Sequence, residues 1–133
     1  MAGNWREALD LPEDVVDELP RGYDVIGSVV IIRMPEHLAA YKDEVGEALI
    51  AKVPQAETAA VDWGVEGTVR ARAIEVIGGK QTLLTEQKEN GCRLLVDVGT
   101  CYYSPRLAGE RARVADQVAE DERVLDMYAG VGP

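Results

Sequence analysis

The chain has 133 residues, which is enough for one compact domain with a hydrophobic core and too few for two ordinary domains. Hydrophobic residues make up 47% of it and charged residues 29%, a balance that excludes a disordered or fibrous protein. The net charge of −10 argues against a phosphate-binding protein unless basic side chains gather locally. The second half offers such a group: Arg70, Arg72, Arg93, Arg106, Arg111 and Arg113.

Two further classes of protein are disfavoured. No apolar stretch approaches the roughly 20 residues of a membrane-spanning helix. The first ten residues are partly charged and lack the apolar block of a secretory signal, so we expect a cytoplasmic protein. Cys92, Cys101 and His37 do not have metal-ligand spacing, so we expect no metal site and two reduced, buried thiols.

The first third of the chain predicts a short helix, a strand and a longer helix. Acidic residues after Asp10 are typical of a helix start, and Pro20 predicts its end. The β-branched run Tyr23–Ile32 predicts one buried strand, in which Gly27 marks a bulge or a close approach. Apolar residues at helical spacing predict a helix between Pro35 and Pro54.

The middle of the chain predicts an antiparallel run of strands. Asn90-Gly91 is the strongest hairpin signal in the sequence. Tyr102 and Tyr103, if extended, point to opposite sides, so one of them belongs in the core. The predicted strands are Thr58–Asp62, Thr68–Ile77, Thr82–Lys88 and Cys92–Val98.

The last third predicts a helix, a strand and a glycine loop. Ser104-Pro105 has the form of a helix start, and a helix to about Ala119 is expected, with Leu107, Val114 and Val118 as its inner stripe. A short strand, Val124–Asp126, then runs into Gly130 and Gly132. Such a loop can hold a nucleotide-like cofactor, because glycine lets backbone approach a ligand, but a frayed tail has the same composition.

Two groups of charged side chains are candidates for chemistry. Arg106 and Glu110 are four residues apart and would share one helix face, as a functional base with its neighbour or as an exposed ion pair. Arg70 and Arg72 would share one face of a strand, where they suit a phosphate or a carbonyl oxygen or simply face solvent.

From about Leu19 to Pro133 the chain resembles the archaeal and eukaryotic type of tRNA guanine-N1 methyltransferase that acts beside the anticodon. The resemblance is specific because several unrelated motifs occur in the order of the family. They are Glu66-Gly67-Thr68-Val69-Arg70, Glu75-Val76-Ile77-Gly78-Gly79, Thr85-Glu86, Glu89-Asn90-Gly91-Cys92-Arg93, Val96-Asp97-Val98, Tyr103-Ser104-Pro105-Arg106-Leu107, Glu110-Arg111 and Asp126-Met127-Tyr128-Ala129-Gly130-Val131-Gly132-Pro133.

The resemblance implies an α+β protein. It implies a lead-in segment (1–18), a middle domain on the tRNA side with an antiparallel or mixed sheet and helices (19–103), and a linking helix followed by the first strand of a truncated Rossmann-like methyltransferase domain (104–133). S-adenosylmethionine is the implied cofactor of the full-length parent, and tRNA is its implied partner.

The resemblance also implies residue roles. Arg70 would face the guanine carbonyl oxygen, Tyr102 and Arg106 would lie near the target nucleotide, and Glu110 would be the general base. The residue types suit the chemistry, because guanine N1 carries a proton that a carboxylate must remove while an arginine stabilises charge on the adjacent oxygen. The cofactor loop would contain Asp126, Ala129, Gly130 and Gly132.

The resemblance stops inside the glycine loop. We therefore expect an inactive amino-terminal fragment without affinity for S-adenosylmethionine, whose unpaired end, Val124 to Val131, either pairs with another copy or packs on the surface of its own domain. Two other functions stay open: an aminocarboxypropyl transferase of wybutosine synthesis, which uses the same scaffold, and a non-catalytic RNA-binding or docking module.

Overall fold

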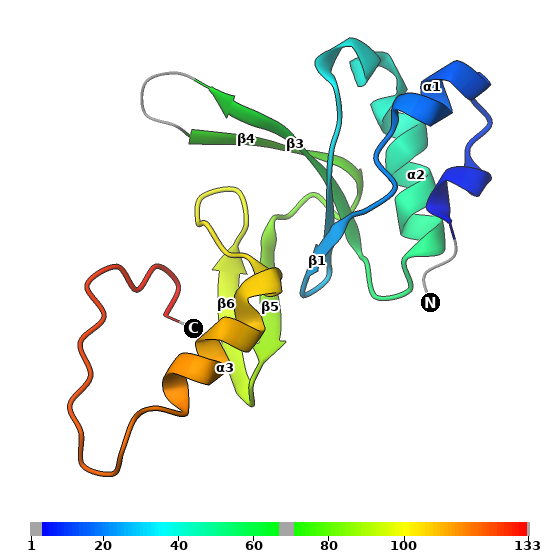
Figure 1. Cartoon of the computed structure of the whole chain (residues 1–133). Helices are drawn as coiled ribbons and strands as arrows, with labels where there is room; N and C mark the ends of the chain where they lie inside the picture. Colours follow the sequence, from blue (N-terminus) through cyan, green and yellow to red (C-terminus); the bar gives the residue numbers. More distant parts are fainter. Residues whose placement is uncertain (1–3, 67–70, 133) are drawn as a thin grey trace.

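The computed structural model describes residues 4–66 and 71–132 and has a mixed α+β architecture, as the sequence predicts (Figure 1). The helices are α1 (Glu13–Glu18), α2 (Lys42–Lys52) and α3 (Ala108–Ala115), with the 3-10 turns η1 (Trp5–Ala8), η2 (Glu36–Tyr41) and η3 (Pro105–Leu107). The strands are β1 (Asp24–Ile26), β2 (Val29–Arg33), β3 (Thr58–Glu66), β4 (Ala71–Gly79), β5 (Leu84–Glu89) and β6 (Cys92–Asp97). Within the described ranges, no helix combines the length and apolar character needed to cross a bilayer.

The strands form two sheets. The larger one has the order β1-β2-β3-β4, in which β2 and β3 are parallel and the outer pairs are antiparallel. The segment that contains η2 and α2 connects the two parallel strands, which need a long connection of this kind. The smaller sheet is the β5-β6 hairpin, whose turn residues Asn90 and Gly91 have φ of 48° and 80°, as a type I′ turn requires. The hairpin predicted from Asn90-Gly91 is thus confirmed.

The central strand β2 is buried on both faces. Val30 and Ile32 belong to one hydrophobic cluster, with Trp5, the helices and β3. Val29 and Ile31 belong to a second cluster, which includes residues of and after β6. Because successive side chains of a strand point to opposite faces, this alternation places α2 on one face of the large sheet and the β5-β6 hairpin on the other.

Helix α2 approaches β4 closely through glycine. A Cβ built on Gly46 would lie 2.2 Å from the carbonyl oxygen of Ile77, and one built on Gly78 would lie 3.0 Å from the carbonyl carbon of Gly46. The helix and strand backbones are therefore in direct contact, and neither glycine has room for a side chain.

The run Tyr23–Ile32 is not the single strand that we predicted. A two-residue turn at Gly27 and Ser28 divides it into β1 and β2, and Gly27 has φ of 56°. The predicted close approach at Gly27 is confirmed, because its Cβ would lie 2.2 Å from Thr85 Oγ1. The hairpin forms because glycine at positive φ is available between two β-branched runs.

Other predicted boundaries also differ. Strand β3 continues to Glu66, and the beginning of the predicted strand from Thr68 lies outside the described residues. Of the tyrosines, Tyr103 is 4% exposed and Tyr102 is 68% exposed, so the prediction that one is in the core is confirmed. The prediction of two buried thiols is wrong: Cys92 is exposed and Cys101 is only partly buried, although both are free thiols.

The carboxyl-terminal predictions are the least accurate. Helix α3 ends at Ala115 rather than near Ala119, and the expected inner stripe, Leu107, Val114 and Val118, is exposed. Residues 124–126 form no strand. A strand needs a neighbour to accept its hydrogen bonds, and no described strand lies beside this segment.

The glycine contact between α2 and β4 gives a stability prediction. We expect Gly46→Ala to lower the free energy of unfolding by about 2 kcal/mol, because the overlap with backbone outweighs the better helix propensity of alanine. Gly109→Ala in α3 is the matched control, since nothing lies within 4 Å of its Cβ. Urea unfolding should show a gain of about 0.5 to 1 kcal/mol for this control. Equal gains in both variants would contradict the close contact.

Candidate functional site

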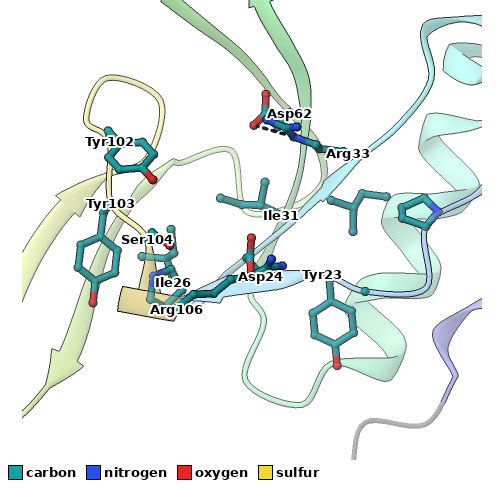
Figure 2. Close-up of a pocket in the computed structure, with 14 residues that line it drawn as sticks. Tyr23, Asp24, Ile26, Ile31, Arg33, Asp62, Tyr102, Tyr103, Ser104 and Arg106 are labelled. Atoms are coloured by element: carbon teal, nitrogen blue, oxygen red, sulfur yellow. Dashed lines mark hydrogen bonds and ion pairs between the residues drawn. The ribbon is translucent and has the colours of Figure 1, made fainter. Parts of the chain in front are cut away.

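A cavity of about 490 Å³ lies between the β1-β2 hairpin and the segment that leads into α3 (Figure 2). Ile26 and Ile31 give it an apolar floor. Tyr102 and Arg106, two residues that the sequence nominates for substrate binding, both line it. The other lining residues are Pro20, Gly22, Tyr23, Asp24, Ile32, Arg33, Asp62, Tyr103, Ser104 and Pro105.

Two arginines reach the cavity from different elements. Arg106 of η3 donates from Nε to Asp24 Oδ1 of β1 at 2.9 Å. Arg33 of β2 lies 3.8 Å from Asp62 of β3, measured from Nε to Oδ2. Figure 2 shows the two arginines on separate parts of the wall, with Tyr102 extending from the loop before η3. The cavity thus combines cationic side chains, an exposed aromatic ring and an apolar floor.

An ion pair between the buried carboxylate of Glu89 and the partly buried Arg111 fixes the segment that carries Tyr102 and Arg106. Arg111 donates from Nε to Glu89 Oε2 at 2.6 Å and from Nη2 to Glu89 Oε1, so the pair is bidentate. The Nη2 of Arg111 also donates to the carbonyl oxygen of Ser104 at 2.8 Å. Tyr103 donates its hydroxyl to Glu89, and the Arg111 guanidinium lies 4.9 Å from the centre of the Tyr103 ring. The end of β5, the loop before η3 and α3 are therefore joined through one guanidinium.

The ionisation of this cluster follows from its contacts. The hydrogen bonds from Arg111, followed by that from Tyr103, hold the pKa of Glu89 below its usual range despite burial. The pKa of Arg111 is raised, mainly by its hydrogen bonds to Glu89. Burial raises the pKa of the Tyr103 hydroxyl, and the neighbouring carboxylate of Glu89 raises it further. At neutral pH the cluster is a charged pair with a neutral phenol.

The sequence analysis gave no role to Glu89 or Arg111. One signal was available: Thr85, Gln87 and Glu89 share a face of β5 by period two, and Thr85 and Glu89 are buried. A glutamate on a buried strand face requires a cationic partner. The sequence could not identify which of the arginines in the second half supplies it.

The expected pairing of Arg106 with Glu110 is wrong. Glu110 accepts hydrogen bonds from Arg113, at 2.8 Å from Nε, while Arg106 is held by Asp24. The Arg113 guanidinium lowers the pKa of Glu110, so the exposed carboxylate is charged at neutral pH. Side chains four residues apart can pair when both belong to one α-helix. Here Arg106 lies in the 3-10 turn η3 that precedes α3, and Glu110 pairs instead with Arg113, three residues further along the helix.

Arg70, the other nominated catalytic residue, lies outside the described residues, so its relation to Glu110 stays a prediction. The nearest described residue, Ala71, pairs with Glu66 at the start of β4. Among the described residues, no cluster of side chains suited to a metal ion is found.

The nominated cofactor loop is exposed. Gly130 and Gly132 have φ of 58° and 79°, and a Cβ on either would meet nothing within 4 Å. Asp126 Oδ1 accepts a hydrogen bond from the amide of Tyr128 at 3.0 Å, which closes a local turn. Val131 packs against the second hydrophobic cluster. Both glycines therefore have the conformation and the free space that a ligand-approaching loop needs.

Two family models cover nearly the whole chain. Residues 5–82 match the TYW2 N-terminal domain, which is more than half of the chain. Residues 85–133 match the TRM5/TYW2 methyltransferase domain. The chain belongs to the TRM5/TYW2 family. The resemblance on which the residue roles above depend is thereby confirmed at the level of the family.

Comparisons with individual TRM5/TYW2 proteins support this family assignment. The tRNA (guanine(37)-N(1))-methyltransferase Trm5b of Pyrococcus abyssi is 39% identical over 98% of this chain and 40% of its own length, and its crystal structure matches with a TM-score of 0.86. The complex of aTrm5 with tRNALeu matches with a TM-score of 0.80 at 36% identity, over 90% of this chain and 37% of that one. TYW2 of P. horikoshii in complex with MeSAdo matches with a TM-score of 0.73 at 31% identity, over 99% and 47%. The chain spans less than half the length of each of these relatives.

The buried ion pair gives the next prediction. We expect Arg111→Met to lower the free energy of unfolding by about 3 kcal/mol, because it leaves the Glu89 carboxylate buried without its partner. Arg113→Met, two residues further along α3, removes an exposed ion pair and should change stability little. Urea unfolding of both variants measures the difference, and equal losses would contradict the distinction.

The pH dependence of the free energy of unfolding tests whether the charge of Glu89 causes this loss of stability. Since the folded pKa of Glu89 is lowered, the stabilisation by the pair is fully present above the ordinary glutamate pKa of about 4.3. It is lost as the pH falls through the lower, folded value. The stability difference between the wild type and Arg111→Met should therefore shrink on acidification, and a difference that grows would contradict the assignment.

Proposed function

We propose that the protein forms the substrate side of an S-adenosylmethionine-dependent tRNA guanine-N1 methyltransferase that modifies the guanine beside the anticodon. The observation that carries the proposal is the meeting of Tyr102 and Arg106 at one cavity, from a segment fixed by the buried Glu89–Arg111 pair. The similarity to tRNA (guanine(37)-N(1))-methyltransferases, and to aTrm5 in its complex with tRNALeu, supports tRNA as the partner. We further propose residues 19–103 as the tRNA-side domain and 104–133 as the start of the catalytic domain.

Tyr102 and Arg106 suit contact with an unpaired nucleotide. Tyr102 is 68% exposed at the cavity, and an exposed aromatic side chain is the type on which an unpaired base stacks. The Arg106 side chain is 74% exposed, and its fork of N–H donors matches a phosphate or a base oxygen. Asp24 holds that guanidinium at the cavity in the free protein, so RNA has to compete with this half-exposed carboxylate for it.

Proton removal from guanine N1 is assigned to Glu110. Its carboxylate is ionised and exposed, as a proton acceptor must be, but the hydrogen bonds from Arg113 make it a weaker base. We propose that Glu110 leaves Arg113 when the guanine is bound, since a free carboxylate is the stronger base. Arg70 is proposed to stabilise negative charge on the adjacent guanine oxygen.

Asp126, Ala129, Gly130 and Gly132 are proposed to contribute one wall of the cofactor site. S-adenosylmethionine supplies the methyl group from its sulfonium when it is bound. The positive φ and unobstructed Cβ directions of Gly130 and Gly132 suit a backbone that approaches such a ligand. Asp126 orders the start of the loop through its bond to the Tyr128 amide.

A second candidate is an aminocarboxypropyl transferase of wybutosine synthesis on the same scaffold. It is favoured by the match of residues 5–82 to the TYW2 N-terminal domain and by the similarity to P. horikoshii TYW2. Among the solved structures, the higher identity to Trm5b, 38% against 31% for TYW2, favours the methyltransferase. A non-catalytic RNA-binding module would also use Tyr102 and Arg106, but would not require the glycine loop.

Fluorescence anisotropy with a labelled tRNA transcript that has guanine beside the anticodon tests the proposal. We expect salt-sensitive binding that Tyr102→Ala weakens by about ten-fold, because a stacking contact is lost. Arg106→Gln should weaken binding and reduce its salt dependence. Tyr128→Ala, at a tyrosine that is even more exposed (91% against 68%) and lies outside the cavity, is the control. Absence of binding by the wild-type chain, or equal losses for Tyr102→Ala and Tyr128→Ala, would contradict the proposal.

A further inference from the structure

Arg33 is a second cationic side chain at the cavity, and the roles given above do not include it. It is the last residue of β2, and its side chain is 76% exposed. The described residues nominated from the family motifs all lie beyond residue 100 in the sequence, so Arg33 belongs to a different part of the wall.

The sheet itself directs Arg33 to the cavity. Val29 and Ile31 face the second hydrophobic cluster, and Arg33 continues their alternation along β2. In the parallel register of β2 and β3, Arg33 lies beside Asp62. Asp62 follows Ala60 by two residues, so its side chain points to the same face of the sheet as Ala60, which belongs to the second cluster. Both side chains therefore belong to the face of the sheet that the cavity occupies, and both line it.

The two partners, Arg33 and Asp62, differ in burial and in hydrogen bonding. The Asp62 side chain is 1% exposed, and its Oδ1 accepts a hydrogen bond from the Gly64 amide at 2.9 Å, so the carboxylate is fixed. Arg33 approaches Asp62 only to 3.8 Å, which is beyond hydrogen-bond length. Within the described part of the chain, no hydrogen bond of the Arg33 guanidinium is found. Its N–H donors are thus directed by charge toward Asp62 and remain available to a ligand.

We propose that Arg33 binds a backbone phosphate of the RNA strand that enters the cavity, on a wall separate from that of Arg106. The inference rests on the proposed function and extends it. An unpaired nucleotide has a phosphate on each side of its sugar. A cavity with an exposed tyrosine, an apolar floor and one arginine on each of two walls offers a partner for the base and for both phosphates.

Because the protein is acidic overall, RNA is attracted only where arginines gather, as at this cavity. With a net charge of −10, the molecule as a whole repels a polyanion. Attraction must come from local arginines whose own carboxylate partners are few. Among the residues that the structure describes, the carboxylate partner found for Arg33 is Asp62, which is buried, so an approaching phosphate meets the exposed guanidinium first.

Arg93 provides a matched control for the test. Its side chain is 69% exposed, it is paired with Glu86 at 3.5 Å, and it lies on β6 outside the residues that line the cavity. Arg33→Gln and Arg93→Gln therefore remove the same charge from similarly exposed, loosely paired positions. Both variants are expected to fold, which a thermal unfolding curve verifies before binding is measured.

The experiment is a titration of the same labelled tRNA transcript with the whole chain at several salt concentrations. We expect Arg33→Gln to weaken binding by about five-fold and to reduce the slope of log K against log salt by slightly less than one, as loss of one phosphate contact requires. Arg33→Lys should keep most of the slope and lose part of the affinity, because the charge remains without the fork of donors. Arg93→Gln should leave both unchanged.

The outcomes separate the two proposals. If the wild-type chain binds and Arg106→Gln weakens it, but Arg33→Gln matches the wild type, the role of Arg33 is overturned and the proposed function stands. Equal losses for Arg33→Gln and Arg93→Gln also overturn it, because they report net charge alone. If the wild-type chain does not bind, the proposed function and this inference fall together.

Discussion

The cavity depends on the contact between the β1-β2 turn and strand β5. The amide of Gly27 donates to Gln87 Oε1 at 2.6 Å, and the amide of Ser28 donates to Thr85 Oγ1 at 2.9 Å. A Cβ on Gly27 would lie 2.2 Å from Thr85 Oγ1, so only glycine permits this distance. The turn thus ties the small hairpin to the face of the large sheet. Since the cavity lies between the β1-β2 hairpin and the segment after β6, this contact helps to hold its two walls together, along with the Arg106–Asp24 hydrogen bond and the second hydrophobic cluster.

The Glu89–Arg111 pair extends this contact from β5 to the segment that carries Tyr102 and Arg106. Glu89 is on the strand face that contains Thr85 and Gln87, and Arg111 joins it to the carbonyl of Ser104. One line of polar contacts therefore runs from the large sheet through β5 to the segment that carries Tyr102 and Arg106. The exposed side chains proposed to contact RNA are thus positioned by groups that do not line the cavity.

Sequence reasoning predicted the elements best where one local signal decides the structure. Asn90-Gly91 fixed the β5-β6 hairpin, and the proline before η2 marked the start of the helical segment. The predictions were wrong where tertiary contacts decide the structure. Tyr23–Ile32 forms two strands and not one, and residues 124–126 form no strand. At the site, the motifs selected Tyr102 and Arg106, which the structure brings to one cavity. They could not show that Asp24 rather than Glu110 holds Arg106, because those partners are 82 residues apart.

The most direct test of this account is amide hydrogen exchange in Gly27→Ala, compared with Gly91→Ala. Both glycines have positive φ, but nothing lies within 4 Å of a Cβ on Gly91. Gly91→Ala therefore measures backbone strain alone, and Gly27→Ala adds the overlap with Thr85. We expect Gly27→Ala to reduce protection in β5, β6 and residues 103–111 more than in β2 and β3, and more than Gly91→Ala does. Equal loss of protection throughout both sheets, or identical behaviour of the two variants, would contradict the dependence of the cavity on this contact.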